Sequence, residues 1–276
     1  MIYIKDVLTK WVNSRPDKEY NYISPSSLGG CNRAHYFKIK GVKQTTPPSE
    51  SALLNFQMGF VWEEVIKKAL DELKIPYKFQ EYFEDKELNT GGTIDFMLPA
   101  DLDNLYPQHE ALDVSKMAYK AGARMPIPTI DWKSIETVIH DSKTMASKWF
   151  WYLEKSNKDF GLENEHYLYQ LGLYIILARR AGYNCNKGLL TFISKDDSMV
   201  GKEYEFTLTP EWEEKILTRV KRLNANLKAN KLPPCECENW RVAYCGFGDP
   251  ATREVNKTKK LVNTSCCSEK LMETVA

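Results

Sequence analysis

One helix limits the fold of this chain more than any other feature. Residues 165–181 are apolar on nearly every face apart from Gln170 and the two polar ends, and Gly182 follows as a stop signal. A helix of this kind must be buried. The chain has 276 residues, 43% of them hydrophobic and 27% charged, so it can bury such a helix in a full core. Disordered and fibrous classes are excluded.

The other apolar patterns predict alternating helices and strands around this helix. Apolar residues at helical spacing before Pro76 indicate a long helix. An alternating aromatic stretch, an Asn-Thr-Gly-Gly turn and then a short apolar run broken only by Asp95 indicate a hairpin. Thr209 and Pro210 are an N-cap and a first helical residue. We expect helices over 51–74, 165–181 and 209–230, a hairpin formed by 77–83 and 93–98, and strands over 128–133, 188–194 and 202–208.

Two acidic residues interrupt these apolar strand sequences. Asp95 and Asp131 would be buried at a cost unless each is paired or bound to a cation, and acids on adjacent strands can share one cation. The side-chain period of a strand puts Lys133 on the same face as Asp131, with Trp132 turned to the core. We therefore predict a metal site with a lysine beside it. The alternative is a strand-edge salt bridge between Asp131 and Lys133.

Two helices carry further polar residues at a spacing of four. Glu63 follows Gly59 on one helix face, where a glycine lets another backbone or a nucleic acid approach closely. Gln170 and Tyr174 share a face of the apolar helix, so their polar groups need partners in the protein or at a cleft. The alternatives are a solvated glutamate and a satisfied core network.

Seven cysteines, an odd number, stand in a chain without a signal-peptide pattern or an apolar stretch long enough to cross a bilayer. We expect a cytoplasmic protein in which clustered cysteines bind metal. The net charge of +1 leaves any nucleic acid to be held by a local basic groove. Cys31 stands alone near the N-terminus, whereas Cys235, Cys237 and Cys245 lie close together.

The ordered series resembles the PD-(D/E)XK nuclease superfamily, in its RecB-like branch. It consists of Gly59-x-x-x-Glu63, Ile94-Asp95, Ile130-Asp131-x-Lys133 and Gln170-x-x-x-Tyr174. The resemblance implies an α/β, restriction-endonuclease-like core with a central mixed sheet flanked by helices. It implies Mg²⁺ or Mn²⁺ bound by Glu63, Asp95 and Asp131, with Lys133, Gln170 and Tyr174 as further catalytic residues. The family commonly has histidine where Glu63 stands.

The sequence around Cys31 resembles the iron-sulfur members of this branch, including CRISPR-associated RecB-like exonucleases, AddB and phage relatives. The resemblance implies a 4Fe-4S cluster bound by Cys31, Cys235, Cys237 and Cys245, which would join the N- and C-terminal segments. Zinc is the alternative metal, and Cys266 or Cys267 the alternative ligand. The implied parts are an N-terminal segment (1–50), a nuclease core (51–208, with an insertion at about 99–128), a C-terminal helix and cysteine cluster (209–248) and a polar tail (249–276).

The expected function is that of a metal-dependent DNA nuclease, an exonuclease acting on single-stranded DNA or DNA ends, with a helicase or recombination protein as a possible partner. Lysines and aromatic residues over 143–152 predict either a path for a single strand or a helix packed on the core. Two other functions stay open: a non-catalytic nucleic-acid-binding or scaffold protein with the same fold, and a metal-binding regulatory protein.

Overall fold

The computed structural model describes residues 4–14, 21–101, 130–146, 165–196, 201–236 and 245–247. The chain forms two compact units. One unit comprises Met1–Gln57, Asp85–Gly91 and Glu214–Ala276, and the other comprises Met58–Glu84 and Gly92–Glu213. Most of the expected insertion and the polar tail lie outside the described residues. Among the described helices, none combines the length and apolar character that a membrane span requires.

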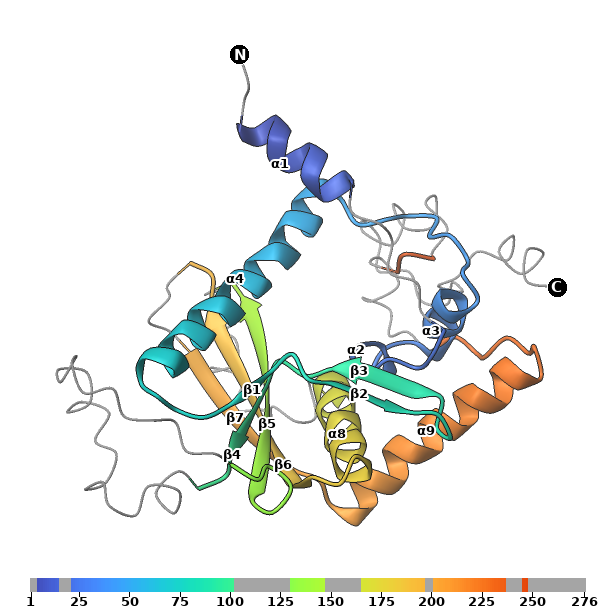
Figure 1. The fold of residues 1–276 in the computed structure, drawn as a ribbon. Coiled ribbons are helices and arrows are strands. Elements are labelled where there is room, and N and C mark those ends of the chain that lie inside the picture. Colours follow the sequence, from blue (N-terminus) through green and yellow to red (C-terminus); the bar gives the residue numbers. More distant parts are fainter. Residues whose placement is uncertain are drawn as a thin grey trace, which may run out of the picture. The chain divides into compact units, whose positions relative to one another are not determined.

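A mixed five-stranded sheet forms the centre of the second unit (Figure 1). Its strands follow the order β1-β4-β5-β6-β7, with β5 and β6 parallel and the other neighbours antiparallel. The strands are β1 (Lys78–Phe79), β4 (Phe96–Pro99), β5 (Glu136–Met145), β6 (Asn184–Ser194) and β7 (Gly201–Thr207). The predicted α/β class with a central mixed sheet is confirmed.

The predicted buried helix is α8 (Glu165–Arg180), which lies between β5 and β6 in sequence and packs on the sheet. Such a helix is the usual connection between parallel neighbours. Ten consecutive residues of α8, from Tyr169 to Ala178, are buried. The contact with β6 is close: a Cβ added at Gly188 would lie 2.5 Å from Cγ of Leu171. Gly188 therefore lets α8 sit directly on the strand.

The predicted hairpin is also present, with an irregularity in each arm. The strands β2 (Tyr82–Asp85) and β3 (Thr90–Thr93) pair with each other, while β1 and β4 pair in the larger sheet. Between these pairs, the amide of Gln80 donates to the carbonyl of Asp95 and that of Ile94 to Glu81. Asp95 consequently lies at a bend one residue before β4.

The strand predicted over 128–133 is wrong in its described part, residues 130–133. The Asp131 side chain accepts a hydrogen bond from the Lys133 amide, and its carbonyl accepts from the Ser134 amide. This is the local pattern by which aspartate favours a turn over a strand. The strand begins at Glu136 instead, so β5 was placed too early in the chain.

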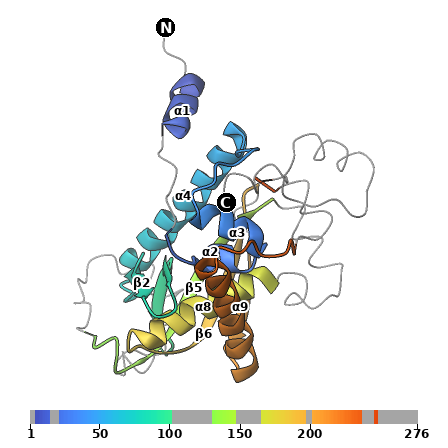
Figure 2. The ribbon, with the colours of Figure 1, turned by 90° about the vertical axis from the view of Figure 1, so that its right-hand side faces the viewer.

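The first unit contains α1 (Ile4–Asn13), α2 (Pro25–Leu28), α3 (Asn32–Ile39) and most of α9 (Pro210–Lys228), as Figure 2 shows. Its buried side chains include Leu28, Tyr36 and Phe37 near the N-terminus and Ile216, Val220 and Leu223 of α9. The hydroxyl of Tyr36 donates to Asn230, just beyond α9. The predicted helices over 51–74 and 209–230 are confirmed as α4 (Glu50–Glu72) and α9.

Candidate active site

Acidic side chains gather around the middle of β5. We define the acidic cluster as Glu63 of α4, Asp95 before β4, Asp141 and Lys143 of β5, and Gln170 of α8. Phe96 pairs with His140 in the β4–β5 register, so Asp95 and Asp141 are each one residue from that pair on neighbouring strands. The amide and hydroxyl of Ser142 donate to Oδ2 of Asp95, at 2.8 and 3.2 Å.

Asp141 is the centre of the cluster, and both of its oxygens are engaged. The residue is 1% exposed. Nε2 of Gln170 donates to its Oδ1 at 2.8 Å, and Nζ of Lys143 lies 2.7 Å from its Oδ2. Because side chains two apart share a strand face, Asp141 and Lys143 point to the same side of β5. The sheet and α8 together fix this carboxylate.

The cluster carries more negative than positive charge. Burial raises the pKa of Asp95 to about 7, and repulsion from Asp141 adds to this effect while Lys143 opposes it. Burial likewise raises the pKa of Glu63, against the hydrogen bond from Gln80. For Lys143, burial lowers the pKa, but attraction to Asp141 and Asp95 outweighs it and the net direction is upward. Three carboxylates therefore share one ammonium group.

This charge excess fits a divalent cation. Carboxylate oxygens are the donors that Mg²⁺ and Mn²⁺ prefer, and a cation would relieve the repulsion between Asp95 and Asp141. As they stand, no three His, Cys, Asp or Glu side chains of the described residues are drawn together closely enough to ligate one ion. Glu63, Asp95 and Asp141 could hold a metal after a local adjustment of side chains.

Asp131 and Lys133 do not belong to the acidic cluster. Both are exposed, and Nζ of Lys133 lies 5.7 Å from the ring centroid of Tyr183, beyond the C-terminal end of α8. Gln170, which contacts Asp141, lies ten residues before the C-terminal end of α8. At a rise of 1.5 Å per residue, this is about 15 Å along the helix axis. The predicted pair is therefore corrected: the aspartate and lysine beside Asp95 are Asp141 and Lys143.

The remaining predicted residues differ in how close they lie to the acidic cluster. Gln170 contacts Asp141, as a role in the site requires, and Tyr174 is buried one turn further along α8. The ring beside Lys143 is that of Tyr167, with Nζ 5.8 Å from its centroid. The sequence predicts Lys143 either in a path for a single strand or on a helix packed on the core, whereas the structure puts it in the acidic cluster, on strand β5. Residues 148–152 of that path lie outside the described residues.

A sequence signal for Asp141 existed but was missed. Thr137, Val138 and Ile139 are β-branched residues, which favour a strand. Burial then alternates along β5, with residues 137, 139 and 141 buried. An acid at a buried position of such a strand, followed two residues later by lysine, has the same Asp-x-Lys pattern as Asp131 and Lys133.

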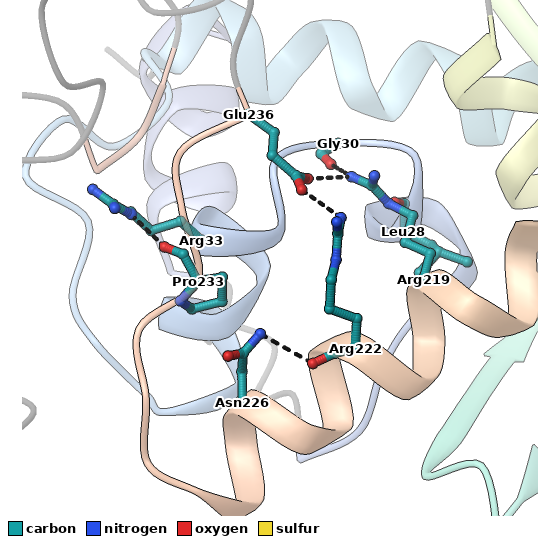
Figure 3. A network of polar contacts seen from close by, with 8 residues as sticks. All are labelled: Leu28, Gly30, Arg33, Arg219, Arg222, Asn226, Pro233 and Glu236. Carbon is teal, nitrogen blue, oxygen red and sulfur yellow. Dashed lines mark hydrogen bonds and ion pairs between the residues drawn. The ribbon is translucent and has the colours of Figure 1, made fainter.

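The segments that carry the cysteines in the first unit are linked by an arginine network (Figure 3). Nε of Arg33 donates to the carbonyl of Pro233 at 2.8 Å. Arg219 of α9 donates to the carbonyls of Leu28 and Gly30 and pairs with Glu236, 3.0 Å away. Arg222 also pairs with Glu236. These bonds connect the chain just before Cys31 to the chain around Cys235.

The third described cysteine of the predicted cluster lies near the end of α3. Burial lowers the pKa of Lys38, which lies near the end of α3, and electrostatic interaction with Cys245 partly opposes this shift. The next two residues hold this segment, since the Gly246 carbonyl accepts from the Thr46 amide and the Phe247 ring contacts Phe37. Cys237, Cys266 and Cys267 lie outside the described residues.

One side chain beside Cys31 lacks a polar partner. Both polar atoms of Asn32, which is 1% exposed, make no hydrogen bond. A buried amide in this state is costly unless another group satisfies it. Thiolate sulfur in a bound cluster or zinc site can accept from such an amide. Among the described residues, however, Cys31, Cys235 and Cys245 do not form a three-ligand group, and Cys235 is disulfide-bonded in this structure.

Comparisons with known proteins add the following. No protein-family model and no curated protein matches the chain. Among solved structures, the crystal structure of SSO0001 matches with a TM-score of 0.47 and 19% identity, covering 95% of this chain and 98% of that chain. An alkaline exonuclease (LHK-Exo) from Laribacter hongkongensis matches with a TM-score of 0.46 and 10% identity, covering 80% and 92%. At these TM-scores and identities the matches do not assign a function to this chain. The proposed function rests instead on the side chains of the acidic cluster.

Proposed function

We propose that the protein is a metal-dependent DNA nuclease of the PD-(D/E)XK type. The observation that carries this proposal is the buried Asp141, paired with Lys143 on one strand face and fixed by Gln170, one strand away from Asp95. Nuclease chemistry needs these parts: carboxylates for a divalent metal and a cation for the charge that develops on the phosphate.

The residues of the acidic cluster would have different roles in the reaction. Asp95 and Asp141, with Glu63 from α4, would hold Mg²⁺ or Mn²⁺, which when bound polarises a water and neutralises phosphate charge. Lys143 stands on the same face of β5 as Asp141 and beside Tyr167, where its ammonium group can orient the water or contact the phosphate. Gln170 fixes one oxygen of Asp141 and leaves the carboxylate oriented.

Single-stranded DNA or DNA with a free end is the substrate that we propose, which corresponds to the RecB-like branch. A helicase or recombination protein is the kind of partner that would supply such DNA. We also propose that Cys31, Cys235, Cys237 and Cys245 bind a 4Fe-4S cluster that joins the chain ends. In support, Arg33 and Arg219 already hold the Cys31 and Cys235 segments together.

Cleavage of end-labelled single-stranded and duplex DNA tests the proposed activity. Wild-type protein should degrade at least one of these substrates with Mg²⁺ or Mn²⁺ and neither in EDTA. Tight DNA binding without any metal-dependent cleavage would contradict the proposal and favour a non-catalytic binding protein with this fold.

The cysteine site has its own test. Protein purified without oxygen should be brown and contain four irons per chain, as expected for a 4Fe-4S cluster. A colourless preparation with one zinc and no iron would contradict the cluster and support the zinc alternative.

A further inference from the structure

Helix α4 presents an exposed aromatic ring close to the acidic cluster. Phe60 is 50% exposed. It lies three residues before Glu63, and residues three or four apart are neighbours on one helix face. None of the residues of α4, which can be followed in Figure 1, is buried. A large apolar side chain that is half exposed contributes little burial free energy in the free protein. It is available to contact a ligand.

Gly59 opens the same face. It lies four residues before Glu63, in the interior of α4, where glycine weakens a helix relative to alanine. Its φ angle is not in the left-handed region, and a Cβ added there would meet nothing within 4 Å. Packing against the residues that the structure describes therefore does not explain the glycine. A ligand backbone that passes close to the helix would.

The opposite face of α4 provides an internal comparison. Val61 and Val65 are 52% and 49% exposed, close to the value for Phe60. At 100° per residue, both lie on the side of the helix away from Glu63. Apolar exposure alone therefore does not single out Phe60. Phe56 is a second exposed aromatic residue of α4, at 59%, but it lies seven residues before Glu63. Phe60 combines an exposed aromatic ring with a position within one turn of Glu63 and next to the open backbone at Gly59.

We propose that Phe60 stacks on a base of a single-stranded nucleic acid whose backbone passes Gly59 on its way to the acidic cluster. This inference rests on the proposed nuclease function and assigns a residue that would recognise its single-stranded substrate. An aromatic side chain stacks on any base, so the contact is independent of sequence. In a duplex each base is already stacked between its neighbours, so a ring on the protein surface selects for unpaired bases.

Binding of short labelled oligonucleotides in EDTA, measured by fluorescence anisotropy, tests the proposal without any cleavage. Two strands of equal length are compared, one with bases and one abasic. Phe60→Ala should weaken binding of the base-bearing strand about tenfold, within the range for one stacked base, and leave the abasic strand unchanged. Phe60→Trp should bind like the wild type. Gly59→Val should weaken both strands, because its side chain would obstruct the backbone.

The matched controls are Val61→Ala and Val65→Ala, which remove equally exposed apolar groups from the other face and should change neither affinity. Three results would overturn the proposal: an equal loss for both strands in Phe60→Ala, no loss for either, or a change of oligomeric state, which would make Phe60 a contact between copies. If wild type shows base-dependent binding that Phe60→Ala abolishes but never cuts DNA, the stacking role stands and the proposed nuclease function fails.

Discussion

The hydrogen bond from Gln170 to Asp141 is the contact through which α8 fixes the acidic cluster, and its removal has a predictable cost. The donor is 7% exposed and the acceptor 1% exposed, with 2.8 Å between Nε2 and Oδ1. A hydrogen bond to a charged group contributes about 1.5–3 kcal/mol to stability. Gln170→Leu keeps the apolar bulk and removes the donor, so it should lower the free energy of unfolding by about 2 kcal/mol.

Denaturant unfolding monitored by circular dichroism measures this loss. The charge of Asp141 provides a second test, because hydrogen bonds to ionised groups are roughly twice as strong as neutral ones. In an Asp141→Asn background, Gln170→Leu should therefore cost only about 1 kcal/mol. The same loss in both backgrounds would mean that Gln170 acts through packing, and no loss in either would refute the contact itself.

Three further predictions concern packing, protonation and the arginine network. Gly188→Ala should lower the free energy of unfolding by about 1–3 kcal/mol, because its Cβ would lie 2.5 Å from Cγ of Leu171; in thermal unfolding, the double variant with Leu171→Ala should cost less than the sum of the two single changes. Burial, with Lys38 and Arg219 nearby, lowers the pKa of His35 to about 3, and its Nε2 accepts from the Ser24 amide. The folded protein therefore keeps His35 neutral while the unfolded chain protonates it below about pH 6.5, so this stability is complete above pH 6.5 and falls as the pH is lowered toward 3. Relative to His35→Gln, the wild type should lose about 1 kcal/mol between pH 7.5 and 5.5, measured by denaturant unfolding at each pH, and a constant difference would contradict a buried neutral histidine. Arg219→Met should lower both the melting temperature and the iron or zinc content per chain, whereas Lys221→Met, on the exposed side of α9, should change neither.

Helices with strong patterns could be predicted from the sequence. The helix α8 is apolar on nearly every side, and α9 begins at Thr209-Pro210, so local sequence alone defines them. The polar residue Gln170 was correctly predicted to need a partner, because a buried amide must form a hydrogen bond wherever the helix packs. Asp95 was identified for the same reason: its carboxylate interrupts apolar sequence beside a strand.

Sequence alone could not show which of two Asp-x-Lys patterns supplies the second acid of the site. Asp131 and Asp141 are both followed two residues later by lysine. Which of them enters the core depends on the β4–β5 register, and that register follows from long-range pairing. The turn at Asp131 is held by the aspartate side chain itself, so residues that look like a strand lie outside the sheet. Tyr167 was missed because its partner, Lys143, is distant in sequence.

We propose Asp141 and Lys143, and not Asp131 and Lys133, as the catalytic centre. Initial rates of DNA cleavage with Mg²⁺ or Mn²⁺ should be compared for Asp141→Asn, Lys143→Met, Asp131→Asn and Lys133→Met, each checked for folding by circular dichroism. We predict that the two changes on β5 each reduce the rate by at least about a hundredfold, and that the two changes in the exposed turn leave it near the wild-type value. Full activity of Asp141→Asn, or a loss confined to Asp131→Asn and Lys133→Met, would contradict this account.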